Sequence, residues 1–261
     1  MPELPDVEIF RRYLNRKALN KKIKDVDIKN SKIISAAKTK YVKALRNKKI
    51  NSSKRYGKYL FAELGKKNNL MFHFGMTGFL KYFKNLEAEP QHGRFLIKFY
   101  NGYYLAWNNQ RLLGEVKLVD SIKGFIEKKN LGPDALSLNL PLFEKLIGGK
   151  TGSIKSALMK QELIAGVGNI YSDEILYQAK INPASNCKKL KNKDIEILFE
   201  NLKKVLKEAI KYKADPDKMP DSWLLTHRSK EGRCGRCGKG IKHQKISGRT
   251  SYFCPRCQKK S

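Results

Sequence analysis

Four cysteines near the end of the chain restrict the local fold more than any other feature of the sequence. They form two CxxC pairs separated by sixteen residues: Cys234, Cys237, Cys254 and Cys257. This spacing is typical of a site in which four thiolates hold one structural zinc ion. A lone CxxC pair could instead be a redox dithiol, and His243 could replace one ligand. We predict a zinc-stiffened hairpin over 245–253, with Gly248 and Arg249 at its tip.

The charge of the chain predicts a polyanionic partner. Its 261 residues include 55 Lys and Arg against 24 Asp and Glu, a net charge of +31, which exceeds what solubility requires. A lysine-rich proteome or an acidic membrane surface would also explain this excess. No apolar run approaches the roughly 20 residues that cross a bilayer, and the first residues lack a secretory signal. We therefore expect a monomeric cytoplasmic protein, associated with the nucleoid and not with membranes, in which Cys187 is a free thiol.

The first half of the chain has the periodicity of one helix followed by strands. A helix is predicted from Pro5 to about Leu19, because Val7, Phe10 and Leu14 recur at helical spacing. Alternating β-branched and aromatic residues then predict an antiparallel, two-sheet β-sandwich. Its predicted strands are 23–28, 59–64, 69–74, 94–100 and 115–119.

The second half has helical periodicity. The Gly-Pro of LGPDAL (131–136) ends a helical stretch and predicts a hinge over 131–138. The helices predicted beyond it are 141–147, 153–164, 171–179 and 191–212. The fold class is therefore α+β, with a sandwich domain over 1–130, a helical domain over 139–229 and a four-cysteine finger over 230–261.

The first three residues can perform covalent chemistry. Removal of Met1 would leave Pro2 as a free secondary amine. An α-amino group titrates at about 7.7 to 8.0, so part of it is an unprotonated nucleophile at neutral pH. Attack on a sugar aldehyde carbon would give a cationic iminium, and Glu3 could move protons on and off the sugar. The alternative is that Pro2 and Pro5 merely open a helix.

Other segments carry candidate contacts to phosphates or bases. Lys58 follows a glycine at the entrance of a predicted strand, where its charge could hold a phosphate. The turn in AGVGNIYSDE (165–174) precedes a helix, and its N–H groups and asparagine amide would make a phosphate cradle. Met76 lies between two glycines, where an apolar side chain could insert between bases. His73 and His92 lack the spacing of a metal pair and are expected to pack in the core or contact phosphate.

In their order along the chain, these segments resemble the formamidopyrimidine-DNA glycosylase and endonuclease VIII family of base-excision repair enzymes. The matching segments are MPELPDVE (1–8), GKYL (57–60), HFGMTG (73–78), LGPDAL (131–136), AGVGNIYSDE (165–174) and GRTSYFCPRCQ (248–258). The resemblance covers essentially the whole chain, and ELP at 3–5 is closer to the formamidopyrimidine-DNA glycosylases than to the EGP of endonuclease VIII. It implies a β-sandwich flanked by helices, a helix-two-turn-helix domain and a zinc finger, with damaged or abasic double-stranded DNA bound in the cleft between.

The resemblance also implies roles for individual residues. Pro2 would be the Schiff-base nucleophile and Glu3 the acid/base, with Lys58 beside them on a phosphate. The residues that would contact DNA are His73, Met76, His92, Arg111, Leu113, Asn169 and Arg249. Members of the family remove the base and then cleave the backbone by β,δ-elimination.

Three departures from the family pattern bear on the substrate. Leu113 of NNQRLLG (108–114) replaces a usual phenylalanine wedge, QHGR (91–94) keeps one histidine of a usual KHDH, and the segment 213–232 is short. Leu113 and the short 213–232 segment weaken the expectation that 8-oxoguanine is a substrate. An endonuclease VIII-like enzyme for oxidised pyrimidines or abasic sites, a non-catalytic DNA-damage-binding homologue and a zinc-ribbon RNA-binding protein are the alternatives.

Overall fold

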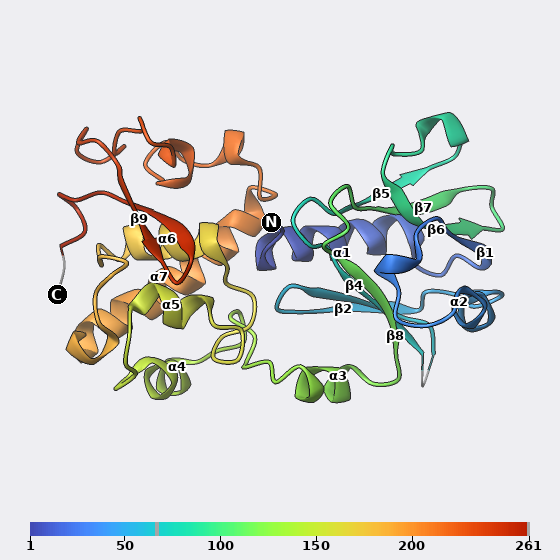
Figure 1. The fold of residues 1–261 in the computed structure, drawn as a ribbon, viewed down its shortest axis with the longest axis horizontal. Coiled ribbons are helices and arrows are strands. Elements are labelled where there is room, and N and C mark those ends of the chain that lie inside the picture. The colour runs from blue at the N-terminus through green and yellow to red at the C-terminus, as the bar shows by residue number, and fades with distance from the viewer. Residues whose placement is uncertain (66–67, 260–261) are drawn as a thin grey trace. The chain divides into compact units, whose positions relative to one another are not determined.

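The computed structural model describes residues 1–65 and 68–259 and divides the chain into two compact units (Figure 1). Unit 1 contains Met1–Pro2 and Asp6–Asn130, and unit 2 contains Glu3–Pro5 and the chain from Leu131 onward. Strands dominate the first unit and helices the second, which confirms the predicted α+β class. Within the described residues, no helix is long and apolar enough to span a bilayer.

Unit 1 is built on two four-stranded antiparallel sheets. In one sheet the order is β1 (Ile23–Ile28), β6 (Gly93–Phe99), β7 (Tyr104–Asn108) and β5 (Phe79–Phe83). In the other it is β2 (Ser52–Tyr56), β3 (Tyr59–Glu63), β4 (Asn69–His73) and β8 (Glu115–Val119). Both sheets contribute to one buried cluster, in which Phe72 of β4 meets Phe95 of β6 edge to face at 6.4 Å between ring centroids. The predicted sandwich is therefore confirmed.

Three helices accompany these sheets: α1 (Leu4–Ala18), α2 (Lys38–Leu45) and α3 (Ile122–Lys128), with short 3-10 turns at Ser31–Ile33 and Leu86–Ala88. The apolar stripe of α1 places Val7 and Leu14 fully inside the core of unit 1. Asp6 in its first turn and Lys17 in its last match the two ends of the helix dipole. α1 thus follows its sequence pattern, with its start one residue earlier than predicted.

Unit 2 packs four helices around a second core. They are α4 (Leu140–Ile147), α5 (Ile154–Met159), α6 (Asn169–Gln178) and α7 (Asn192–Lys211), with 3-10 turns at Cys187–Lys189, Pro216–Lys218 and Leu225–His227. Seven of the ten residues of α6 are buried, so this helix is the centre of the unit. The hairpin of β9 (Lys242–Ile246) and β10 (Arg249–Phe253) lies beside α6 (Figure 1).

The predicted helix over 153–164 is wrong beyond Met159. Lys160 leaves the helical conformation, and the Gln161 amide closes a loop by donating to the carbonyls of Met159 and Val167, both at 2.8 Å. The backbone carbonyl of Gln161 accepts from the N–H of Gly132 at 2.9 Å. The loop therefore binds the 131–135 segment, and a hinge over 131–138 stays a prediction.

Candidate functional site

Glu3 lies at the N-terminal end of α6, and only 1% of it is exposed. Its carboxylate accepts hydrogen bonds from the backbone N–H groups of Gly168 at 2.7 Å, Ile170 at 2.8 Å and Tyr171 at 3.3 Å. The first N–H groups of a helix have no partner inside the helix, and they lie at the positive end of its dipole. The N–H groups of the turn in 165–174 therefore hold the chain's own carboxylate, and a phosphate contact of this turn stays a prediction.

The two glycines of this turn allow Glu3 and Leu4 to approach its backbone. A Cβ on Gly168 would lie 2.3 Å from the Glu3 Cδ, and one on Gly166 would lie 2.5 Å from the Leu4 Cδ1. Leu4 donates its N–H to the Gly166 carbonyl at 3.1 Å. Close backbone approach thus fixes Glu3, and the half-exposed Pro2 is attached to it by one peptide bond.

A buried carboxylate on α6, Asp173, joins four parts of unit 2. One of its oxygens accepts from Lys155 Nζ at 2.6 Å and from Ser251 Oγ at 2.7 Å. The other accepts from Arg228 Nη2 at 2.9 Å and from the N–H of Tyr252 at 3.1 Å. The Lys155 side chain is fully buried, and burial lowers its pKa while Asp173 opposes that shift. The sequence analysis missed this network, because its members are far apart in the chain.

Asn169 and Arg249, both predicted DNA contacts, come together in unit 2. The Asn169 amide donates to the carbonyl of Thr250, the residue after Arg249, at 3.1 Å. Arg249 is exposed and pairs with Ile246 as the first residue of β10. The turn itself is formed by Ser247 and Gly248, with φ of 47° and 73°, as two-residue hairpin turns require. The prediction that Arg249 lies at the tip is therefore wrong by one position.

The four cysteines have the geometry of a tetrahedral metal site. Their sulfur atoms all lie within 4.8 Å of one another, with 3.8 Å between Cys234 and Cys257 and 3.6 Å between Cys237 and Cys254. Zinc–sulfur bonds of about 2.3 Å separate the sulfurs of a tetrahedral site by about 3.8 Å. The cluster therefore fits one structural zinc ion. Among the described residues, the group of side chains that could bind this metal consists of the four cysteines. His243 is not part of it, and its ring instead lies 5.8 Å from that of Tyr252 on the hairpin.

Lys58 and His73 lie close together in unit 1. Lys58 occupies the two-residue turn between β2 and β3, after Gly57 with φ of 53°, and is 8% exposed. His73 ends β4, with its ring 5.1 Å from that of Tyr59. Burial lowers the pKa of His73; Glu115 opposes this shift, and Lys58 adds to it. The structure thus places a neutral histidine beside a cation.

Two loops of unit 1 hold the predicted base contacts. The loops 74–78 and 109–114 are joined by the Asn109 amide, which donates to the Phe74 carbonyl at 2.9 Å. A Cβ on Gly75 would lie 2.6 Å from the Leu113 backbone, so the loops touch directly. Met76 and Leu113 project from them with 37% and 54% of each residue exposed.

His92 and Arg111 are connected to the same loops. The backbone carbonyl of His92 accepts from the N–H of Asn109 at 2.9 Å, and its ring lies 3.3 Å from an Arg94 nitrogen. Arg111 is exposed within 109–114. One further exposed aromatic, Phe79, begins β5 and pairs with Asn108. The sequence analysis missed Phe79, although its place one residue after HFGMTG was a usable signal.

Comparisons with known proteins match the whole course of the chain. The model for the formamidopyrimidine-DNA glycosylase N-terminal domain matches residues 1–116, and that for the formamidopyrimidine-DNA glycosylase H2TH domain matches 131–220. A model for a zinc finger found in formamidopyrimidine-DNA glycosylase and isoleucyl-tRNA synthetase matches 232–260. The chain belongs to the formamidopyrimidine-DNA glycosylase family.

The match between this chain and its relatives extends over the full length of both. The chain is 32% identical over 274 residues to the formamidopyrimidine-DNA glycosylase of Lactococcus lactis, covering 100% of both chains, and 33% identical to that of Pelotomaculum thermopropionicum, covering 99% of both. A crystal structure of the Lactococcus lactis enzyme bound to DNA with an abasic site matches with a TM-score of 0.91 and 31% identity, over 99% of this chain and 100% of that one. The expected family, enzyme class and zinc finger are thereby confirmed.

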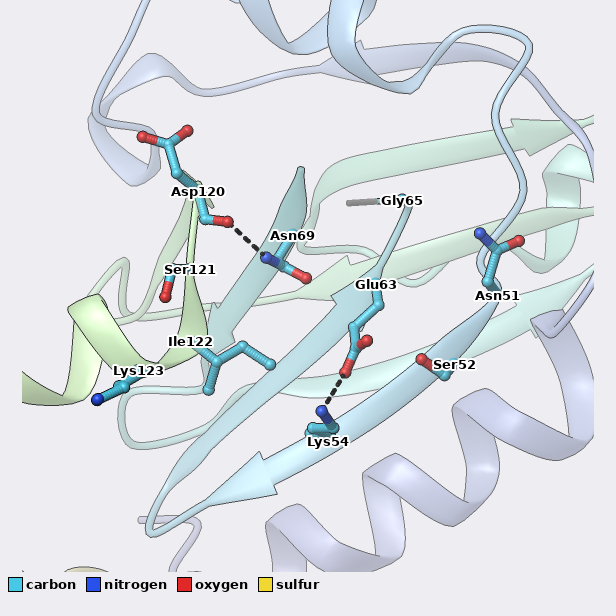
Figure 2. Close-up of a pocket in the computed structure, with 10 residues that line it drawn as sticks. All are labelled: Asn51, Ser52, Lys54, Glu63, Gly65, Asn69, Asp120, Ser121, Ile122 and Lys123. Carbon is cyan, nitrogen blue, oxygen red and sulfur yellow. Dashed lines mark hydrogen bonds and ion pairs between the residues drawn. The ribbon is translucent and has the colours of Figure 1, made fainter. Parts of the chain in front are cut away.

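One hollow of unit 1 is separate from the predicted glycosylase residues. It has a volume of about 560 Å³ and is lined by residues between Asn51 and Lys123, none of which was predicted to act (Figure 2). An ion pair of 3.3 Å between Lys54 and Glu63 crosses its floor, and Asn69 donates to the Asp120 carbonyl at 3.2 Å. These polar groups are paired with each other, so we assign no ligand to this hollow.

Proposed function

We propose that this protein removes oxidised bases, formamidopyrimidine or related lesions, from double-stranded DNA and then cleaves the backbone at the abasic site. One observation carries the proposal: in a chain of this family, the Glu3 carboxylate is fixed on the N-terminus of α6, directly after Pro2. Once Met1 is removed, an amine nucleophile and a proton carrier are joined by one peptide bond. Both can therefore reach the same sugar.

The chemistry begins at the nitrogen of Pro2. Its lone pair attacks C1′ of the damaged nucleotide, the glycosidic bond breaks with its electrons going to the base, and the proton lost from the Pro2 nitrogen neutralises the departing base. Glu3 passes a proton to the ring oxygen, the C1′–O4′ bond opens, and Pro2 is left as an iminium on C1′. The iminium makes the C2′ proton acidic, so its removal expels the 3′ phosphate. A second elimination expels the 5′ phosphate, and water then releases Pro2.

The remaining residues contact the DNA and do not take part in breaking the glycosidic bond. Extrusion of a nucleotide costs a few kcal/mol and is easiest for a damaged base. Lys58, Asn169 and Arg249 would hold the phosphates that flank the extruded nucleotide, and His73 and His92 would contact the backbone. The gap in the duplex would be filled by Met76, Arg111 and Leu113.

Zinc would hold the hairpin that carries Arg249 and would take no part in the reaction. The proposed domains are 1–130, 139–229 and 230–261 with a hinge at 131–138. The proposed setting is the nucleoid DNA of the cytoplasm, where the protein acts as a monomer.

Borohydride trapping tests the proposal. Protein whose Met1 removal is verified by mass should form a covalent, borohydride-stable complex with an abasic duplex, because the reductant converts the iminium to an amine. Protein that retains Met1 is the matched control and should form no complex. A trimmed protein that binds abasic DNA without trapping would refute the lyase and favour a non-catalytic DNA-damage-binding protein.

The preferred lesion needs a separate assay. Excision from duplexes with formamidopyrimidine, 8-oxoguanine, thymine glycol or dihydrouracil would rank the substrates under one set of conditions. Because Leu113 offers less stacking area than a phenylalanine, we expect formamidopyrimidine to be cut faster than 8-oxoguanine. Faster cutting of the two oxidised pyrimidines would favour the endonuclease VIII-like alternative.

A further inference from the structure

The positive charge of this protein is concentrated in one part of unit 1. Residues 11–58 contain 18 Lys and Arg and two Asp, a net charge of +16. About half of the total of +31 thus lies in less than a fifth of the chain. A lysine-rich composition alone would spread this charge evenly, so the concentration needs another explanation.

The fold places six of these cations on or near α2. The segment after α2 runs beside the start of β1, where the Ile23 N–H donates to the Lys48 carbonyl at 2.8 Å and Lys22 pairs with Lys49. We call the exposed lysines of this region the α2 surface: Lys22, Lys38, Lys40, Lys43, Lys48 and Lys49. Figure 1 shows α2 and β1 side by side in unit 1.

The α2 surface has little negative charge of its own. Asp25, on β1, is paired with Arg46 at 2.8 Å. Within the described part of the chain, the six lysines form no ion pair. Mutual repulsion among them destabilises the folded state, and a bound polyanion would relieve it.

An exposed tyrosine is part of this surface. Tyr100 is 55% exposed and donates its hydroxyl to the Asn47 side chain at 2.8 Å. The Lys22 ammonium lies 5.2 Å from the centre of its ring. Lysines interleaved with an exposed aromatic ring are typical of nucleic-acid-binding surfaces.

The surface suits a phosphate backbone better than a membrane. A basic helix that lies in a bilayer surface also offers apolar side chains to the lipid. In α2, Tyr41 and Leu45 are instead fully buried in the core of unit 1, and Val42 and Ala44 are partly buried against it. Only the charged side of α2 is presented to a partner.

The α2 surface is remote from the proposed nucleophile along α1. This helix has 15 residues, a length of about 22 Å at 1.5 Å per residue. Pro2 precedes its first turn, and Lys22 follows its last. No residue of the α2 surface can therefore reach the sugar that Pro2 attacks.

We infer that the α2 surface is a second DNA-binding surface, which holds the phosphate backbone of duplex DNA whether or not a lesion is present. It would give the enzyme affinity for undamaged DNA, separate from the contacts around the extruded nucleotide. The inference rests on the proposed function for its choice of DNA as the polyanion. The property to be measured is binding to DNA that contains no lesion.

The test is the salt dependence of binding to an undamaged duplex of about 30 base pairs. The α2 variant replaces Lys38, Lys40, Lys43 and Lys48 with glutamine, which keeps side-chain length and helix propensity. Each lost phosphate contact lowers the slope of log K against log salt by about 0.9. We therefore expect a slope smaller by about 2 to 4, with affinity at least about tenfold weaker at 0.15 M salt.

A matched control removes the same charge elsewhere. It replaces the exposed lysines of α7 with glutamine, at Lys193, Lys204, Lys207 and Lys211. α7 also carries four acidic residues, Asp194, Glu196, Glu200 and Glu208, so loss of these lysines should change the slope by less than about 1. A third variant with arginine at the four α2 positions should restore the wild-type slope, which separates charge from misfolding.

Three results would overturn the inference. One is an α2 variant whose slope equals that of the α7 control, and another is an arginine variant that fails to restore the slope. The third is an α2 variant that no longer binds vesicles of anionic lipid but has the same slope as the wild type in DNA binding. Cleavage of abasic DNA at saturating enzyme should be the same in the α2 variant and the wild type. If the wild type fails to cleave, the proposed function fails, while the slope still decides whether the α2 surface binds DNA.

Discussion

Gly168→Ala should disable the proposed acid/base while leaving every reactive group in place. The new Cβ would lie 2.3 Å from the Glu3 Cδ, whereas carbon atoms in contact lie at about 3.5 Å or more. The carboxylate must therefore move by about 1.2 Å. Its hydrogen bond to the residue 168 N–H, now 2.7 Å, would lengthen beyond hydrogen-bonding range. Backbone strain adds nothing, because Gly168 has φ of −126° and ψ of −157°, which alanine also adopts.

The expected loss can be given in two quantities. Each hydrogen bond to a charged group contributes about 1.5 to 3 kcal/mol, so loss of the bond to the residue 168 N–H would destabilise unit 2 by about that amount. A misplacement of about 1 Å costs on the order of 10²-fold in rate. We expect single-turnover cleavage of an abasic duplex to be about a hundredfold slower.

Gly240→Ala is the matched control for this prediction. A Cβ at Gly240 would meet nothing within 4 Å, so both its rate and its thermal midpoint should stay near those of the wild type. Circular dichroism and zinc content would verify that both variants fold. A Gly168→Ala rate within twofold of the Gly240→Ala rate would refute the idea that the α6 N-terminus positions Glu3.

Three further predictions concern unit 2. Lys155→Met should lower the free energy of unfolding by about 3 to 5 kcal/mol, because it leaves buried Asp173 short of a cation. Lys160→Met, at an exposed position, is the control in thermal melts. An equal loss of stability in both variants would contradict this prediction. Burial raises the pKa of Glu174 to about 7 from 4.5, so between these pH values the native state binds more protons than the unfolded state, and stability falls by about 3 kcal/mol as pH rises through this window. Glu174→Gln should remove that component of the pH dependence of chemical denaturation, and an unchanged pH profile would show that the carboxyl does not titrate there. Cys254→Ser should weaken binding to abasic DNA in a titration while unit 1 keeps its strands, and unchanged affinity would contradict a role for the finger in binding.

Strands with clear alternation were predictable from the sequence, and those without it were not. β1 and β8 have their predicted bounds, because alternating apolar residues define one buried face. β2 is polar (SSKRY) and lies at the edge of its sheet, where pairing on one side suffices to form a strand. β5 and β7 were also missed, although β7 lies in the interior of its sheet. All three strands lack the alternation of apolar and polar residues that marks a half-buried strand, so local periodicity does not reveal them.

The candidate site divides in the same way. The four cysteines were predictable, because a metal site of this kind depends on residue type and local spacing, while the roles of Pro2 and Glu3 stay predictions. The role of the 165–174 turn was half predicted: a helix N-terminus attracts an anion, but the sequence does not show that Glu3, more than 160 residues earlier, occupies it. Lys155 illustrates the residues that could not be predicted. A lysine is expected at the surface, and only its contact with the buried Asp173 explains its position.

The zinc finger and the proposed acid/base are connected through α6. Three residues spaced four apart form a stripe along this helix, and each one contacts the finger. The Asn169 amide donates to the Thr250 carbonyl, the Asp173 carboxylate accepts from Ser251 and the Tyr177 hydroxyl lies 3.1 Å from the Cys234 sulfur. Residues at i and i+4 share one face of a helix, so this spacing aligns the whole stripe with one partner. The same helix binds Glu3 at its first turn. A metal site that takes no part in the reaction can therefore affect its rate, because it stabilises the helix whose N–H groups hold the carboxylate.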